Sequence, residues 1–314
     1  MRARVTLPAV TEPSRRRSKA VDAATVGAYR LGSLAARLTP GPLANAAVVP
    51  FGLGASLASA AKREMIERHL RRVNPNLRSN ALRVAVQQAF DSYARYYVES
   101  FRLPTLSKRA VDRSFSVDGF HHITDALALG NGCIFALPHM GGWEWAGRWM
   151  TDQGYPLTVV VEALEPPELF EWFANLRQAL GMTVVPTGPK AGPAVLKALR
   201  ENQIVCLLCD RDLDRNGVEV EFFGERTTLP AGPATLGLRI GAPILPVGVY
   251  FTNSYNGHHA LVRPPVSAVR SGSGLRDDVA RITQSLAHEL EFLIRRAPEQ
   301  WHLFQPNWPS DPGY

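Results

Sequence analysis

Cysteine is scarce in this chain of 314 residues: Cys133, Cys206 and Cys209 are its three cysteines, and each lies in an apolar run. So few cysteines provide no disulfide framework and suit a reducing compartment, which favours a cytosolic location. Cys206 and Cys209 have the spacing of a redox pair, but they fall in a predicted buried strand, where residues three apart face opposite ways. The sequence offers no second cysteine pair, so we expect no metal site.

The sequence also lacks an unbroken apolar run long enough to cross a bilayer. Residues 38–61 carry no charge, but Pro40, Pro42 and Pro50 interrupt them, so a clean spanning helix is not expected. Basic residues flank this run on both sides: Arg15, Arg16, Arg17 and Lys19 before it, and Lys62, Arg63, Arg68, Arg71 and Arg72 after it. The pattern favours two helices lying in a membrane interface and drawn to anionic lipid. A helical hairpin packed on the core is the alternative, and the sequence leaves open whether 38–61 inserts into the membrane or lies on it.

Acidic residues are too few to balance the basic ones. The chain has 28 Asp and Glu against 35 Lys and Arg, which gives a net charge of +7 and a pI near 9.6. This charge predicts an anionic partner, such as nucleic acid, acidic lipid or a phosphorylated substrate. The sequence has no zinc-finger spacing and no basic β-platform rich in aromatic residues, so we expect a membrane surface and no nucleic acid.

The apolar content of 46% is enough to bury a large core in one domain. Residues 1–20 are basic, contain proline and show no apolar periodicity, so they are predicted to form a loose tail. Residues 21–314 are predicted to form a single domain, with an N-terminal helical layer at 21–110 and a catalytic core at 115–308. Apolar residues at spacings of three and four predict two helices in that layer, at 62–73 and 77–101.

From about residue 115 onward, short β-branched runs alternate with helical stretches. This alternation predicts an α/β fold in which helices cover both faces of a mostly parallel central sheet. The expected strands are 133–137, 157–161, 183–185, 204–209, 218–223, 244–251 and 260–262. The expected helices are 143–150, 167–180, 193–199, 233–240 and 277–295.

Residue types suited to catalysis gather where one predicted strand ends. His139 follows the strand at 133–137, and ligands of open α/β sheets bind beyond such strand ends. Glu144 can meet His139 only if the histidine precedes the helix and Gly141 and Gly142 bend the chain. A histidine with a carboxylate behind it and helix N-terminal amides in front can deprotonate a hydroxyl that attacks a carbonyl. A surface pair is the alternative reading of this spacing, because such a pattern also occurs by chance.

The segment that carries this pattern, 132–144, resembles the active-site motif of the late acyltransferases of lipid A biosynthesis, in which His is followed five residues later by Asp or Glu. Four further blocks resemble that family in the same order: Leu176 and Arg177 with Gly181, 207–211, 217–224 with Gly232 and Pro233, and 298–301. The resemblance covers about residues 62–308.

At two places the sequence departs from the pattern of the lipid A enzymes and resembles one branch of that family. Arg211 stands where glutamine is usual, and 161–168 replaces the family's Tyr-Arg segment. Both features look like the branch that acylates phosphatidylinositol mannosides. That resemblance implies palmitoyl-CoA as donor and co-substrate, no other cofactor, and a mannose hydroxyl of phosphatidylinositol mono- or dimannoside as acceptor, at the cytoplasmic face of the plasma membrane.

The expected mechanism is direct transfer without an acyl-enzyme. His139 removes the hydroxyl proton and Glu144 orients the imidazole, while the backbone of Gly142 or Trp143 stabilises the oxyanion. From its family position, Arg177 is expected to bind the acceptor phosphate or support the site.

Asp210 and Arg211 end a strand near the same crevice. They are expected to position His139 or to bind the acceptor, with a structural salt bridge as the alternative. A lipid A-type secondary acyltransferase and a non-catalytic lipid-binding membrane protein are the alternative functions.

Overall fold

The computed structural model describes residues 19–272 and 274–314. A loose tail was expected at residues 1–20, and residues 1–18 of it lie outside the described residues. At Lys19 the first helix begins.

A seven-stranded sheet forms the centre of the molecule, with the strand order β1-β9-β8-β2-β5-β3-β4. Its strands are β1 (Phe115–Asp118), β2 (Cys133–Leu137), β3 (Leu157–Val161), β4 (Thr183–Pro186), β5 (Ile204–Leu208), β8 (Ile244–Phe251) and β9 (His258–Val262). Neighbouring strands run parallel except β8 and β9, which pair antiparallel. The predicted mostly parallel sheet is confirmed.

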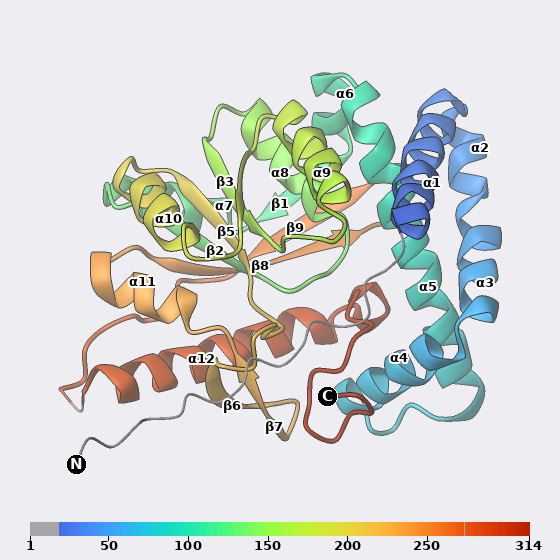
Figure 1. The fold of residues 1–314 in the computed structure, drawn as a ribbon. Coiled ribbons are helices and arrows are strands. Elements are labelled where there is room, and N and C mark those ends of the chain that lie inside the picture. The colour runs from blue at the N-terminus through green and yellow to red at the C-terminus, as the bar shows by residue number, and fades with distance from the viewer. Residues whose placement is uncertain (1–18, 273) are drawn as a thin grey trace, which may run out of the picture.

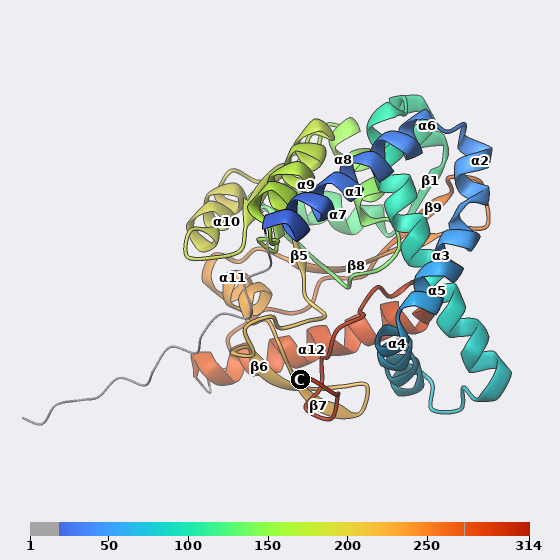
Figure 2. The same ribbon diagram turned by 45° about the vertical axis from the view of Figure 1, so that its right-hand side comes forward.

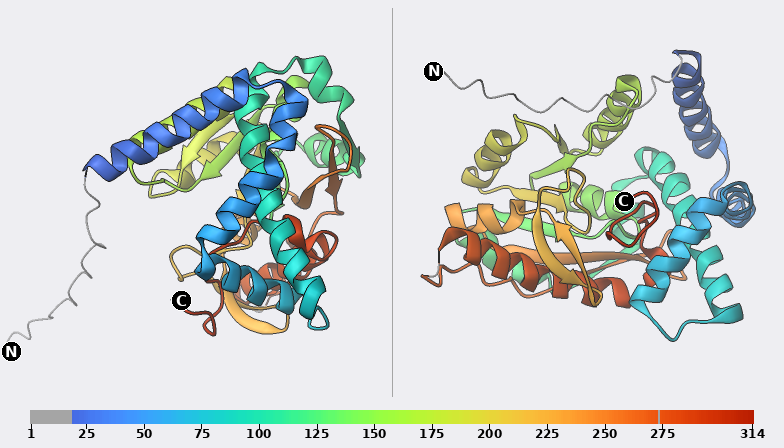
Figure 3. Two further views of the ribbon diagram at one scale, coloured as in Figure 1. Left: turned by 90° about the vertical axis from the view of Figure 1, so that its right-hand side faces the viewer. Right: turned by 60° about the horizontal axis from the view of Figure 1, so that its bottom comes forward.

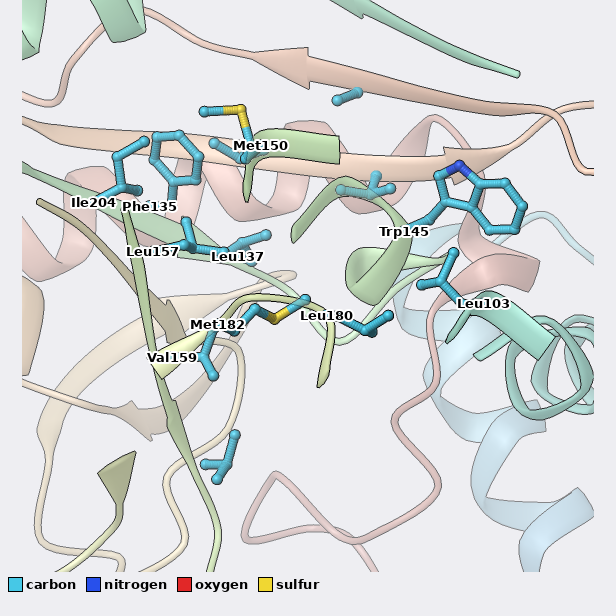
Figure 4. Close-up of a cluster of buried hydrophobic side chains, with 14 of the residues drawn as sticks. Leu103, Phe135, Leu137, Trp145, Met150, Leu157, Val159, Leu180, Met182 and Ile204 are labelled. Carbon is cyan, nitrogen blue, oxygen red and sulfur yellow. The ribbon is translucent and has the colours of Figure 1, made fainter. Parts of the chain in front are cut away.

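Helices cover both faces of this sheet (Figure 1). One face carries α7 (Phe120–Ala128), α8 (Trp143–Asp152) and α9 (Pro167–Ala179), and the other carries α10 (Ala191–Arg200), α11 (Gly232–Ile240) and α12 (Leu275–Arg295). Alternate residues of β2 face the two layers: Phe135 and Leu137 join one apolar cluster, and Ile134 and Ala136 join the other. Figure 4 shows the first cluster, in which Phe135 and Leu137 lie among side chains from α8 and β3.

The N-terminal helices line one side of the molecule (Figures 1 and 2). They are α1 (Lys19–Leu38), α2 (Gly41–Ala46), α3 (Val48–Ala58), α4 (Ala60–Val73) and α5 (Ser79–Arg102). Gly52 of α3 lies so close to α5 that a Cβ atom there would come within 2.8 Å of the Asp91 backbone, so the approach of the two helices requires glycine. The segment Gly41–Ala58, across α2 and α3, is long and apolar enough to cross a membrane, judged by length and composition alone.

The remaining elements are short. They are η1 (Leu103–Thr105), α6 (Lys108–Arg113), β6 (Val218–Phe222), β7 (Glu225–Leu229) and η2 (Pro298–Gln300). The strand expected at 218–223 is β6, which pairs with β7 in a separate antiparallel hairpin rather than in the central sheet. This hairpin packs on α12, on the side of the sheet away from α8 and α9 (Figures 1 and 3).

Candidate active site

His139 and Asp210 follow the carboxyl ends of two adjacent strands. β2 and β5 pair in parallel with Leu137 opposite Leu208, so the residues two positions further along each strand reach the same level. There, Nδ1 of His139 lies 2.6 Å from Oδ1 of Asp210. The imidazole remains 30% exposed while the carboxylate is fully buried, so one ring nitrogen faces Asp210 and the rest of the ring is open to a ligand.

A tryptophan and an asparagine near the C-terminus hold Asp210. Trp301 donates from Nε1 to Oδ2 of Asp210 at 2.7 Å, and Asn307 donates from Nδ2 to the Asp210 backbone oxygen at 3.0 Å. Burial alone would raise the pKa of Asp210, but the adjacent His139 and the hydrogen bonds from His139 and Trp301 hold this pKa below its usual value. Asp210 is therefore a carboxylate that holds His139 through Nδ1 and does not engage Nε2.

The C-terminal segment also holds the backbone of the turn that carries His139. The N–H of His302 donates to the oxygen of His139 at 2.7 Å, and the N–H of Gly141 donates to the oxygen of Gln300 at 3.0 Å. The His302 ring lies 2.9 Å from Oγ of Ser92, and burial lowers its pKa to about 3 with a further contribution from the charge of His139. His302 is therefore a neutral imidazole beside His139.

The prediction that Glu144 contacts His139 is wrong. Glu144 has other partners. Its Oε1 accepts from the Tyr96 hydroxyl at 2.6 Å and from Nη2 of Arg177 at 3.1 Å. Glu144 lies in the first turn of α8, and these partners come from α5 and α9. The pairing of β2 with β5 places the Asp210 carboxylate beside the imidazole. Glu144 instead links α8 to α5 and α9.

Glu144 and Arg177 form a buried ion pair, with 2% and 10% of their side chains exposed. Burial raises the pKa of Glu144, and the charge of Arg177 with the Tyr96 hydrogen bond partly offsets that effect. The guanidinium carbon of Arg177 lies 4.9 Å from the centre of the Trp143 ring. Within residues 19–272 and 274–314, Oε2 of Glu144 and Nε of Arg177 have no hydrogen-bond partner.

Two glycines shape the turn between His139 and α8. Gly141 has φ +56°, and a Cβ atom there would lie 2.0 Å from the Val249 oxygen. A Cβ on Gly142 would lie 2.5 Å from Nε2 of His258. Gly142 caps α8, so the expected bend is present and the first N–H groups of α8 lack intrahelical acceptors.

His139 lies in the walls of two cavities. The first, which we call the aromatic cavity, has a volume of about 260 Å³ and is lined by Tyr29, Tyr93, Tyr96, Tyr97, His139, Trp143, Val161, Glu162, Leu164, Leu169, Phe173, Arg177, Leu208, Arg211, His302, Leu303 and Gln305. The second, which we call the strand-end cavity, has a volume of about 400 Å³ and is lined by His139, Val160, Glu162, Thr187, Leu207, Leu208, Cys209, Arg211, Asp212, Leu213, Asp214, Asn216, Gly217, Pro230, Ala231, Gly232 and Pro233.

Arg211 stands between these cavities. Its Nη2 donates to Oε2 of Glu162 at 2.7 Å, and both side chains line both cavities. A structural salt bridge was the alternative role of Asp210 and Arg211. Arg211 forms one with Glu162, whereas Asp210 pairs with His139.

Sequence reasoning assigned no role in the site to Tyr96, Trp301, His302 or Asn307. Their partners lie 48 to 210 positions away along the chain, so no local pattern marks these contacts. His258 lies buried in β9, with Nε2 2.9 Å from Oε2 of Glu99.

A histidine held by a buried carboxylate at the end of a parallel strand, beside two cavities, is the kind of site found in α/β enzymes. The chain belongs to the bacterial lipid A biosynthesis acyltransferase family, whose model matches residues 15–310. It is an acyltransferase.

Curated relatives agree with this assignment. The chain is 37% identical over 308 residues to a phosphatidylinositol mannoside acyltransferase of Mycobacterium tuberculosis, covering 95% of this chain and 93% of the relative. It is 37% identical over 265 residues to the enzyme of the same name from Mycolicibacterium smegmatis, covering 83% and 84% of the two chains. A lipid A biosynthesis acyltransferase of Haemophilus influenzae is 26% identical over 200 residues, covering 62% and 59%.

Proposed function

We propose that this enzyme transfers a palmitoyl group from palmitoyl-CoA to a mannose hydroxyl of a phosphatidylinositol mannoside, at the cytoplasmic face of the plasma membrane. The observation that carries the proposal is the His139–Asp210 pair at the junction of the aromatic cavity and the strand-end cavity. The names of the relatives at 37% identity support the acceptor. The aromatic and apolar lining of the first cavity suits the fatty-acyl chain.

In the proposed reaction, Nε2 of His139 takes the proton of the mannose hydroxyl while the oxygen attacks the thioester carbonyl. A new C–O bond forms and the C–S bond breaks, so the acyl group passes directly to the sugar. The departing thiolate of CoA takes the proton from the imidazolium, which returns His139 to its starting state. Asp210 holds the imidazole in the tautomer that leaves Nε2 free and stabilises the imidazolium, the task first expected of Glu144.

The backbone N–H groups of Gly142 and Trp143 are proposed to stabilise the oxyanion on the thioester carbon. The N-terminal N–H groups of a helix lack intrahelical partners and carry partial positive charge, so they favour a developing negative charge. Arg177, balanced by Glu144, is proposed to bind an anionic group of a substrate, because its buried Nε is still without a partner in the described chain.

We further propose that α1, α2 and α3 lie on the anionic membrane. Four small or apolar residues at four-residue spacing, Ala44, Val48, Gly52 and Ser56, are buried toward the protein. The opposite faces of these helices expose large apolar side chains, including Leu38 at 75%, Phe51 at 66% and Leu57 at 71%. Such a surface matches a bilayer interface, and the exposed cations Arg37 and Lys62 at its ends match anionic lipid.

The assay that tests this function measures transfer of radiolabelled palmitate from palmitoyl-CoA to purified phosphatidylinositol dimannoside. The proposal predicts a labelled glycolipid and an equal amount of free CoA. Turnover on a lipid A precursor but not on the mannoside would show that the lipid A precursor is the acceptor. No turnover on either lipid would contradict catalysis and favour a lipid-binding protein.

A further inference from the structure

A second acid–histidine pair lies against the turn that follows His139. Nε2 of His258, at the start of β9, lies 2.9 Å from Oε2 of Glu99, in α5, and both side chains are buried, with 0% and 7% exposed. Nδ1 of His258 lies 2.8 Å from the backbone oxygen of Asn256. Oxygen atoms therefore face both ring nitrogens, and these contacts fix the orientation of the ring.

Glu99 is itself held in place by Arg95, one turn earlier in α5. Nε of Arg95 donates to Oε1 of Glu99 at 2.7 Å, and the other two guanidinium nitrogens donate to the backbone oxygens of Thr252 and Gly257 at 2.9 and 3.3 Å. Burial alone would raise the pKa of Glu99, but the adjacent His258 and Arg95 hold this pKa below its usual value. Glu99 is therefore a carboxylate that is fixed to the connection between β8 and β9.

The ring of His258 packs directly on the first turn of α8. It stacks on Trp145, with the ring centres 4.3 Å apart and the planes 19° from parallel. It also fills the space beside Gly142, where a Cβ atom would lie 2.5 Å from Nε2 of His258. Gly142 caps α8, so the position of the first N–H groups of that helix depends on this ring.

His258 does not itself meet a substrate. Its ring is fully buried, and it lines neither of the two cavities beside His139. It can therefore affect the reaction only through the residues that it contacts. A link between α5 and β9 alone would stabilise the fold without changing kcat in the folded protein, and the contact with Gly142 gives the pair a further task.

We propose that Glu99 and His258 are positioning residues for acyl transfer: they hold the turn at Gly142 so that its N–H and that of Trp143 point at the thioester carbonyl. The positioning role rests on the proposed oxyanion role of these two N–H groups. In this arrangement one acid–histidine pair serves the base and the other serves the oxyanion.

His258→Gln and Glu99→Gln remove the two sides of the pair without adding bulk. Each is expected to lower kcat at least tenfold and to leave the KM for palmitoyl-CoA within twofold of the native value, measured well below the temperature of unfolding. Loss of an oxyanion donor costs about 10²- to 10³-fold in kcat, and a displaced donor loses part of that. His259→Gln is the matched control, because His259 is the next residue of β9, faces the other way and has Nε2 3.6 Å from the exposed acid Asp118.

Amide hydrogen exchange followed by mass spectrometry gives a readout that needs no turnover. The N–H of Gly141 donates to the oxygen of Gln300, and the N–H of Trp145 donates to the oxygen of Gly142. Exchange in the peptide 138–146 therefore reports whether the turn is held. Both site variants are expected to exchange there at least tenfold faster than the native chain, with native rates in α12. The control is expected to keep native rates in both segments.

The two readouts separate failure of the positioning role from failure of the proposed reaction. If the native chain transfers no palmitate but peptide 138–146 exchanges faster in the site variants alone, the pair holds the turn and the proposed reaction fails. Near-native kcat in both site variants would overturn the positioning role. Native exchange of peptide 138–146 in them, or equally faster exchange across the whole molecule, would overturn it as well.

Discussion

Nδ1 of His139 and Oδ1 of Asp210 lie 2.6 Å apart, across the ends of two parallel strands whose register sets that distance. Both residues lie two positions beyond the ends of buried strands, and contacts with the C-terminal segment hold the backbone there. Trp301 completes the arrangement by donating to the second carboxylate oxygen. Asp210, and not Glu144, is therefore the carboxylate that contacts His139.

Glu144→Gln is expected to destabilise the fold. It leaves the buried Arg177 charge without its carboxylate, and breaking a buried pair in this way costs about 3–5 kcal/mol. Urea unfolding at pH 7 measures the loss, and the double variant Glu144→Gln, Arg177→Gln should lose less than the sum of the two single variants. A cost below about 1 kcal/mol, or simple additivity, would contradict a coupled buried pair.

Trp301→Phe is expected to lower kcat about tenfold and leave the KM for palmitoyl-CoA unchanged. The variant leaves Oδ2 of Asp210 buried without a donor, a loss of about 1–3 kcal/mol, and a tenfold effect corresponds to about 1.4 kcal/mol. Loss of the donor also raises the pKa of Asp210, so the acid limb of the pH–rate profile should move to higher pH. Trp149→Phe is the matched control, since Trp149 donates to Asp112 outside the site. If both variants had the same pH–rate profile, Trp301 would contribute only to packing.

Folding stability is expected to fall as the pH drops from about 6.5 toward 3, in part because of His302. The unfolded residue binds a proton below its ordinary pKa of 6.5, whereas the folded residue, with a pKa of about 3, stays neutral through this window. The unfolded state therefore holds more protons, and stability decreases by up to about 1.4 kcal/mol for each pH unit. Urea unfolding between pH 4.5 and 6.5 should show a shallower dependence for His302→Gln. The same slope in both proteins would contradict the neutral buried imidazole.

The double variant Phe51→Ser, Leu57→Ser is expected to weaken binding to vesicles that contain phosphatidylglycerol by at least tenfold. Both side chains are exposed, and burying one such apolar side chain in a bilayer contributes about 1.5–3 kcal/mol. Vesicle flotation measures the change. Leu129→Ser is the control, because Leu129 is 64% exposed at the end of α7 and outside α1–α3. Equal loss in the control and the double variant would contradict a membrane face on α2 and α3.

The elements with strong periodicity could be predicted from the sequence, and those held by distant partners could not. The run at 133–137 is apolar throughout, because β2 is buried on both faces, and its bounds match the prediction. β1 (Phe115–Asp118) was missed because it is four residues long and its exposure alternates with no apolar run.

The position of His139 followed from the strand that precedes it, but its partner did not follow from spacing. Glu144 is near in sequence and faces Tyr96 and Arg177, whereas Asp210 is 71 positions away and is brought beside His139 by the order β2-β5 in the sheet. A strand order cannot be read from local patterns, since several arrangements of the same βα units satisfy them. The residues around Asp210 at the C-terminus were missed for the same reason.

We propose that His139 is the base and that Asp210 is the carboxylate that orients it. Palmitate transfer from palmitoyl-CoA to phosphatidylinositol dimannoside by the native chain, His139→Ala and Asp210→Asn tests it most directly, with His288→Ala on the exposed face of α12 as control. We expect kcat to fall about 10²- to 10⁴-fold in both site variants and to stay near native in the control, with native circular dichroism in all three. Near-native turnover by His139→Ala, or full activity in Asp210→Asn, would contradict it.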